Sequence, residues 1–154
     1  MKKNIYISFI FLIFIFSSCS KVNNLISSTI TADLDGTSVK FNDDAAATST
    51  TVSGIHIITI SGNQTGSSGA SFINIEISSN DPISNGASYT DTSATHHASI
   101  EYTENGVDNI DADGITKVTI LSVSSSSIQG TFGGSVSGTS THSFANGAFN
   151  VKFE

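Results

Sequence analysis

Apolar and polar residues alternate along most of the chain that follows residue 28. In residues 72–78, Ile73, Ile75 and Ile77 fall on one face, and polar residues stand between them. Successive side chains of a β-strand point to opposite faces, so this period of two predicts a strand with one buried and one wet face. The same alternation recurs in residues 30–34, 37–41, 98–103, 117–120, 128–132 and 149–153.

Two dipeptides mark expected reversals of the chain. Asp35-Gly36 separates two alternating runs, and Asn146-Gly147 precedes the last one. Both predict tight turns, because glycine and a neighbouring Asn or Asp readily adopt positive φ.

The region between the first hairpin and residue 70 is less regular. Residues 55–60 are strongly apolar and short, which predicts a buried strand in which His56 faces solvent, opposite Ile55 and Ile57. Residues 42–53 are polar and of low complexity, and we expect a loop there.

These segments predict an all-β protein of about eight or nine strands. No stretch carries a convincing helical pattern, so the expected architecture is an antiparallel β-sandwich. A small closed β-barrel is the alternative, because pattern alone does not distinguish open from closed sheets. Uneven strand lengths and long early loops favour the sandwich, and we assign residues 29–154 to this single domain.

Three motifs resemble a recurring family of small lipoprotein domains common in the Bacteroidetes group. The motifs are residues 30–37 with their Asp-Gly turn, residues 128–134, and residues 146–149. The resemblance covers most of the chain after residue 30. It implies an all-β envelope domain of unknown function and brings no catalytic residues with it.

The first twenty residues have the organisation of a secretory signal. Lys2 and Lys3 precede an apolar run over residues 5–16, and small residues lead to Cys19, the single cysteine of the chain. The run is shorter than the roughly 20 residues that a membrane-spanning helix needs. The arrangement resembles a bacterial lipoprotein signal, with residues 1–18 removed, Cys19 lipidated and residues 19–28 forming a tether. A plain signal peptide with a coincidental cysteine is the alternative.

The residues after Cys19 refine the expected location. Ser20 rather than Asp follows the cysteine, which in the better-known sorting systems permits export to the outer membrane. The following residues are not acidic, unlike those of surface-exported lipoproteins of the resembled group. We therefore expect a lipid-anchored protein of the outer membrane that faces the periplasm.

Charge excludes one class of partner. The formal net charge is −7, and removal of Lys2 and Lys3 with the leader makes it −9. Arginine is absent, and phosphate backbones are bound by clusters of Lys and Arg, so nucleic acid is not an expected partner.

One segment imitates part of a calcium loop. Asn109, Asp111 and Asp113 alternate and are followed by Gly114, as oxygen ligands do in the first half of an EF-hand. Position twelve would need a bidentate Glu and is Ile120. The sequence thus leaves two interpretations open, a calcium site on these three residues or a polar hairpin loop.

The four histidines form no metal-ligand spacing. His96 and His97 are adjacent, so on a strand they point to opposite faces, and His56 and His142 are isolated in the sequence. We expect packed or solvated histidines at all four positions. No Gly-x-Ser-x-Gly nucleophile motif is found, and no residue is assigned a catalytic role.

The sequence therefore favours a non-enzymatic binding or structural module held on a membrane through its lipid. Another envelope protein is the expected partner, ahead of a glycan, because the chain has no tryptophan and few tyrosines. An envelope hydrolase, and a calcium- or glycan-binding module, are the alternatives.

Overall fold

The alternating segments pair into one continuous β-structure in the computed structural model, which describes residues 27–66, 71–111 and 114–154. The predicted leader, Cys19 and most of the tether lie outside these residues. Within them the chain forms eleven strands and no helix: β1 Thr29–Leu34, β2 Thr37–Lys40, β3 Asp43–Val52, β4 Ile55–Asn63, β5 Ser71–Ser79, β6 Ser88–Thr90, β7 His96–Glu104, β8 Val107–Asp111, β9 Lys117–Val123, β10 Ser127–Ser137 and β11 Thr141–Lys152.

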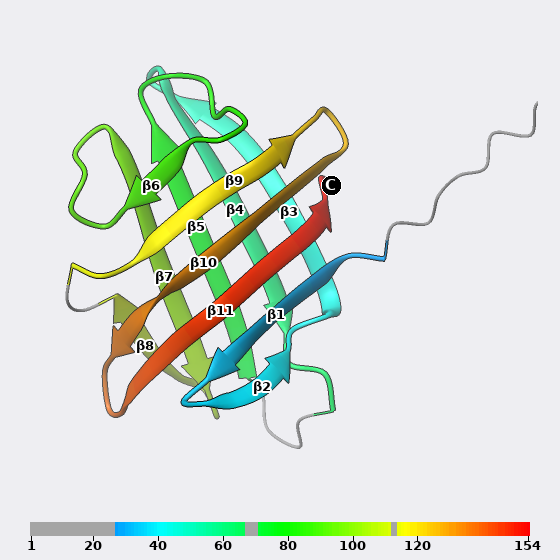
Figure 1. Ribbon diagram of the computed structural model, residues 1–154, viewed down its shortest axis with the longest axis vertical. Coiled ribbons are helices and arrows are strands. Elements are labelled where there is room, and N and C mark those ends of the chain that lie inside the picture. The colour runs from blue at the N-terminus through cyan, green and yellow to red at the C-terminus, as the bar shows by residue number, and fades with distance from the viewer. Residues whose placement is uncertain (1–26, 67–70, 112–113) are drawn as a thin grey trace, which may run out of the picture.

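The strands lie in two crossing layers (Figure 1). One layer holds β9, β10, β11, β1 and β2, and the other holds β7, β5, β4 and β3. The hydrogen-bonded order is β2-β1-β11-β10-β9-β6-β7-β5-β4-β3, so the two layers belong to one sheet that bends at β6. The sheet has two free ends, and these are the outer edges of β2 and β3.

Five strands close into a ring at one side of the molecule. β6 pairs with both β9 and β7, and β8 pairs with both β7 and β10, while β9 and β10 pair with each other. The all-β prediction is confirmed, because 70% of the described residues are in strands and 0% are in helices. The closed ring supports the barrel alternative, and the two outer layers retain part of the sandwich character.

The core lies between the two layers and follows the alternation of the sequence. Ile73, Ile75 and Ile77 of β5 are fully buried, as expected from their shared face. The inward face of β7 carries Ile100 and Tyr102, which are also buried. No helix of the described ranges is long and apolar enough to cross a membrane.

The loop expected at residues 42–53 was wrong, because most of it is the strand β3. Ala46 and Ala47 are buried, and residues from Ala46 to Val52 pair in register with β4. Short Ala, Ser and Thr side chains are enough here because β3 is an edge strand. It has a hydrogen-bonded neighbour strand on one side, and only a small apolar surface to bury.

The turn expected at Asn146-Gly147 was also wrong. Both residues lie inside β11, where Asn146 adopts a φ of 52°. The register shifts at this point against both neighbouring strands, so the dipeptide makes a β-bulge instead of a reversal. A side chain at position 147 would meet the Phe132 carbonyl oxygen at 2.5 Å, and this close approach explains the glycine.

The inward face of β4 is the reverse of the one expected. Ile55 is 41% exposed, whereas Ile58 and Ile60 are buried and stand opposite Ile77 and Ile75 of β5. His56 therefore shares the inward face instead of facing away from it. A run of six mostly apolar residues does not show which alternate positions face inward. The pairing of β4 with β5 determines the inward face instead.

Candidate functional site

A pocket opens between the two layers at the end of the molecule where the chain finishes. Its volume is about 380 Å³, near the lower bound of typical ligand pockets. We call it the mouth pocket and define it by its apolar and polar lining. The apolar lining comes from Ile58, Ile83, Val123 and Phe153, and the polar lining from Ser49, His56, Ser124, Ser125 and Glu154.

Four separate segments supply the apolar part of the mouth pocket. Ile58 belongs to β4 and is 4% exposed, while Ile83, Val123 and Phe153 are partly buried and pack against the core. These side chains come from strands β4 and β9, from the loop after β5 and from the residue after β11, and they rest on the core from several directions.

The polar rim contains no lysine or arginine. His56 is held in place because its Nδ1 lies 3.1 Å from the hydroxyl of Thr51 on the same hairpin. Hydroxyls from Ser49 and Ser125 face the same space. The pocket can thus receive an apolar group and surround it with hydrogen-bonding groups, of which the Glu154 carboxyl group is acidic.

The mouth pocket lies beside the seam between β3 and β11. Ala47 of β3 forms a parallel bridge with Phe153, the residue that follows β11, and the Glu154 amide donates to the Ala47 carbonyl over 3.0 Å. Beyond Ala47, β3 continues for five exposed residues, Thr48 to Val52. This part of the edge has no strand beside it among the described residues.

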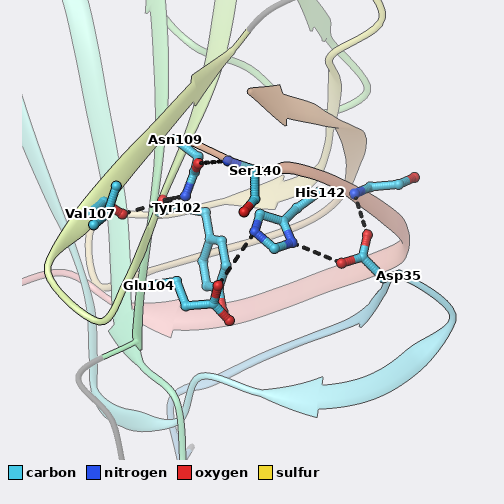
Figure 2. Close-up of polar contacts among 8 residues, drawn as sticks. Asp35, Tyr102, Glu104, Val107, Asn109, Ser140 and His142 are labelled. Atoms are coloured by element: carbon cyan, nitrogen blue, oxygen red, sulfur yellow. Dashed lines mark hydrogen bonds and ion pairs between the residues drawn. The ribbon is translucent and has the colours of Figure 1, made fainter. Parts of the chain in front are cut away.

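A second polar cluster lies away from the mouth pocket (Figure 2). His142 of β11 is 8% exposed, and its Nδ1 lies 2.8 Å from Oδ2 of Asp35. The Ser143 amide donates to the other oxygen of Asp35, also over 2.8 Å. On the opposite side of the imidazole, Nε2 is 3.6 Å from a Glu104 carboxylate oxygen.

These contacts shift two acid–base equilibria. The hydrogen bonds from His142 and the Ser143 amide lower the pKa of Asp35, against a smaller opposing effect of burial. Burial raises the pKa of Tyr102, whose ring meets His142 edge-on with centroids 5.2 Å apart. The hydrogen bond from Ser71 partly offsets the rise for Tyr102.

The cluster holds three distant segments together. Asp35 comes from the β1–β2 turn, His142 from β11 and Glu104 from the end of β7. In a hydrolytic triad the free imidazole nitrogen faces a nucleophilic hydroxyl. Here Nε2 faces the Glu104 carboxylate, so the imidazole lies between two carboxylates, and we call this arrangement the histidine clamp. His142 is isolated in the sequence, and the fold brings its partners to it from distant segments of the chain.

The residues predicted to hold calcium are only partly described. Asn109 and Asp111 belong to β8, which corrects the expectation that this segment is a hairpin loop, and Asp113 lies outside the described residues. Asn109 is buried and donates to the carbonyl oxygens of Tyr102 and Val107. Its own oxygen accepts from the Ser140 amide (Figure 2).

Asp111 also has a partner, since one of its oxygens accepts a hydrogen bond from the Thr116 hydroxyl. In the described ranges no group of three or more His, Cys, Asp or Glu side chains is placed to hold a metal ion. Asn109 and Asp111 thus fasten β8 to its surroundings, and calcium at this segment stays a prediction.

The remaining histidine pair lies at the start of β7. His96 contacts the Thr95 hydroxyl through Nδ1, and its ring lies 5.7 Å from that of Tyr89. Both His96 and His97 are partly buried in the sheet surface.

Compared with known proteins, the chain matches no family model, no curated relative and no solved structure.

Proposed function

We propose that this chain is a lipid-anchored envelope protein whose β-domain binds another envelope protein and carries out no catalysis. In this proposal Cys19 bears the lipid, and residues 19–28 tether the domain to the outer membrane on its periplasmic side. The mouth pocket is the observation that carries the binding role.

The pocket has the properties of a recognition site. It combines apolar side chains that rest on the core with a few polar groups on the rim, which is the usual composition of ligand-binding clefts. It also lies beside an exposed strand edge, so a protein segment has both a pocket and a backbone to contact.

Site-specific photocrosslinking in the native envelope tests the binding role. A photoreactive phenylalanine analogue replaces Ser125 at the pocket rim, and the matched control carries it at Thr131, an exposed residue of β10. We expect a discrete crosslinked species from position 125 that is absent from position 131. Binding at the pocket would be refuted if the two positions gave the same crosslinked species, or if neither position gave one.

Metabolic labelling with a fatty-acid analogue tests the anchor separately. We expect the wild-type chain to be labelled and to fractionate with the outer membrane, and Cys19→Ala to lose the label. Equal labelling of both chains, or of neither, would refute lipidation at Cys19.

The hydrolase alternative predicts a different result. Screens with ester, glycoside and peptide substrates would then show turnover that a single Ser, His or Asp substitution abolishes. Such an activity would overturn the non-enzymatic proposal.

A further inference from the structure

The outer edge of β3 presents backbone groups to solvent in a defined pattern. β3 and β4 are joined by a two-residue turn, Ser53-Gly54, in which both residues have positive φ. In such a hairpin the flanking pair, Val52 and Ile55, is hydrogen bonded across the strands, and the next residue outward, Thr51, directs its backbone away from β4.

The alternation continues along β3. If Thr51 points away from β4, then Ser49 and Ala47 also do, because backbone groups of a strand alternate between its two sides. An observed contact agrees with this alternation. The Ala47 carbonyl accepts a hydrogen bond from the Glu154 amide, which lies on the side of β3 away from β4. The N–H and C=O groups of Ser49 and Thr51 therefore lie on the open edge.

This edge lacks the features that normally prevent strand addition. Proteins protect exposed edges with charged side chains, proline or bulges. Residues 45–55 contain no charged residue and no proline, and β3 and β4 pair without a register shift from Ala46 to Val52. Thr48 to Val52 are all exposed.

The open edge leads directly into the mouth pocket. Ser49 stands opposite Ile58 in the β3–β4 register, so the two share the inward face, and both line the pocket with Phe153. A strand lying beside Thr48 to Val52 would direct alternate side chains toward the same face. The bridge between Ala47 and Phe153 shows that this edge already accepts one strand residue next to the open stretch.

We propose that an extended segment of a partner protein adds to the outer edge of β3 along Thr48–Val52 and places one apolar side chain in the mouth pocket. Main-chain hydrogen bonds supply affinity in this mode, and the pocket supplies specificity. The segment carries no acidic residue at the pocket, because no Lys or Arg lines it and the domain is strongly negative. This inference rests on the proposed binding function and specifies how the partner is held.

The test starts from a phage-displayed library of linear heptapeptides selected on the intact domain. Synthetic versions of the selected peptides are then N-methylated at single positions. We expect methylation at alternate residues to weaken binding at least tenfold, with the intervening positions changing it less than twofold. An Asp in place of the recurrent apolar residue should also weaken binding at least tenfold.

Amide exchange followed by NMR reports the strand directly in the wild-type chain. Peptide binding should protect the Ser49 and Thr51 amides and leave Thr48 and Thr50 unchanged, because the latter two already bond to β4. Protection confined to other strands, or N-methylation effects without a period of two, would overturn the proposal.

A proline pair supplies the matched variants. Ser49→Pro removes an outward N–H, and Ser38→Pro does the same on β2, because exposed Ser38 follows the pair that flanks the β1–β2 turn and also directs its backbone outward. Ser49→Pro should weaken peptide binding at least tenfold and Ser38→Pro less than twofold. A concentration-dependent dimer that Ser49→Pro abolishes would overturn the partner in favour of a second copy of the chain.

The outcomes separate the two proposals. Crosslinking at Ser125 that survives Ser49→Pro would overturn strand addition and leave the binding role intact. If Ser125 gives no crosslink in the envelope at all, the binding role itself fails.

Discussion

His142 and Asp35 are 107 residues apart in the sequence, and the imidazole Nδ1 and a carboxylate oxygen lie 2.8 Å apart. Asp35 adopts a positive φ of 51° in the β1–β2 turn, and its other oxygen accepts the Ser143 amide. The two contacts tie the hairpin tip to the start of β11. Because His142 is nearly fully buried, its Nδ1 depends on this carboxylate for a partner.

Replacement of Asp35 by Ala should therefore destabilise the domain. A buried polar group left without a partner costs about 1–3 kcal/mol. The Asp35 side chain is 50% exposed, so water can partly replace it, and we expect a loss of about 1 kcal/mol. Urea unfolding measures the change. The control is Asp33→Ala, which removes only an exposed contact with Asn146 and should cost less than about 0.5 kcal/mol.

The same carboxylate should make stability depend on pH in the acid range. The pKa of Asp35 is lowered from 3.8 in the folded chain, so its stabilisation is fully present above 3.8 and is lost as pH falls through the lower folded-state value. The stability difference between wild type and Asp35→Asn should then shrink below pH 3.8. Urea midpoints at pH 6 and pH 3 provide the comparison, and a difference that stays constant would contradict this assignment.

The sequence predicted the strands whose two faces differ in environment. β5 and β7 alternate because one face meets the core and the other is wet, and the sequence predicted the shared buried face of Ile73, Ile75 and Ile77. β3 escaped prediction because Ala, Ser and Thr on an edge strand leave no apolar alternation. β8 escaped because its one buried residue is polar, Asn109, which is held by hydrogen bonds and not by hydrophobic packing.

The long-range arrangement could not be predicted from local pattern. The ring closes through β6, a three-residue strand that pairs in parallel with β7 at Thr90 and His97. The histidine clamp depends on β1 lying beside β11, which brings Asp35 to His142. The mouth pocket likewise forms where four segments meet that are far apart in the sequence. The alternation of apolar and polar residues therefore could not predict it.

The β-bulge at Gly147 gives a prediction about packing. A Cβ at this position would lie 2.5 Å from the Phe132 carbonyl oxygen and 2.7 Å from its ring. Forcing extra volume into a packed site costs about 1–3 kcal/mol, so Gly147→Ala should destabilise the domain by about 2 kcal/mol. Thermal or urea unfolding reports this loss. Gly133→Ala is the matched control, since its nearest contact would be 3.3 Å and a small shift relieves it.

Equal effects of the two glycine substitutions would contradict the proposed role of the bulge. A loss confined to Gly147→Ala would instead support the close approach of β11 to Phe132 as the reason for glycine at this position.

Calcium binding at Asn109, Asp111 and Asp113 gives the last prediction. A site that is occupied at 100 times its dissociation constant stabilises the folded state by about 2.7 kcal/mol. If these residues bind calcium, the melting temperature should rise by several degrees in millimolar calcium relative to chelator. Differential scanning calorimetry measures the shift, and magnesium at the same concentration controls for simple screening of the negative domain.

Two variants locate the effect. Asp113→Ala should reduce the shift without touching the hydrogen bonds of Asn109 and Asp111. Asp111→Ala also removes the bond from Thr116, so its melting temperature should be lower even in chelator, and only the calcium-dependent shift is compared. Equal melting temperatures of the wild-type chain in calcium and chelator would refute the site. The role of Asn109 and Asp111 would then be to anchor β8.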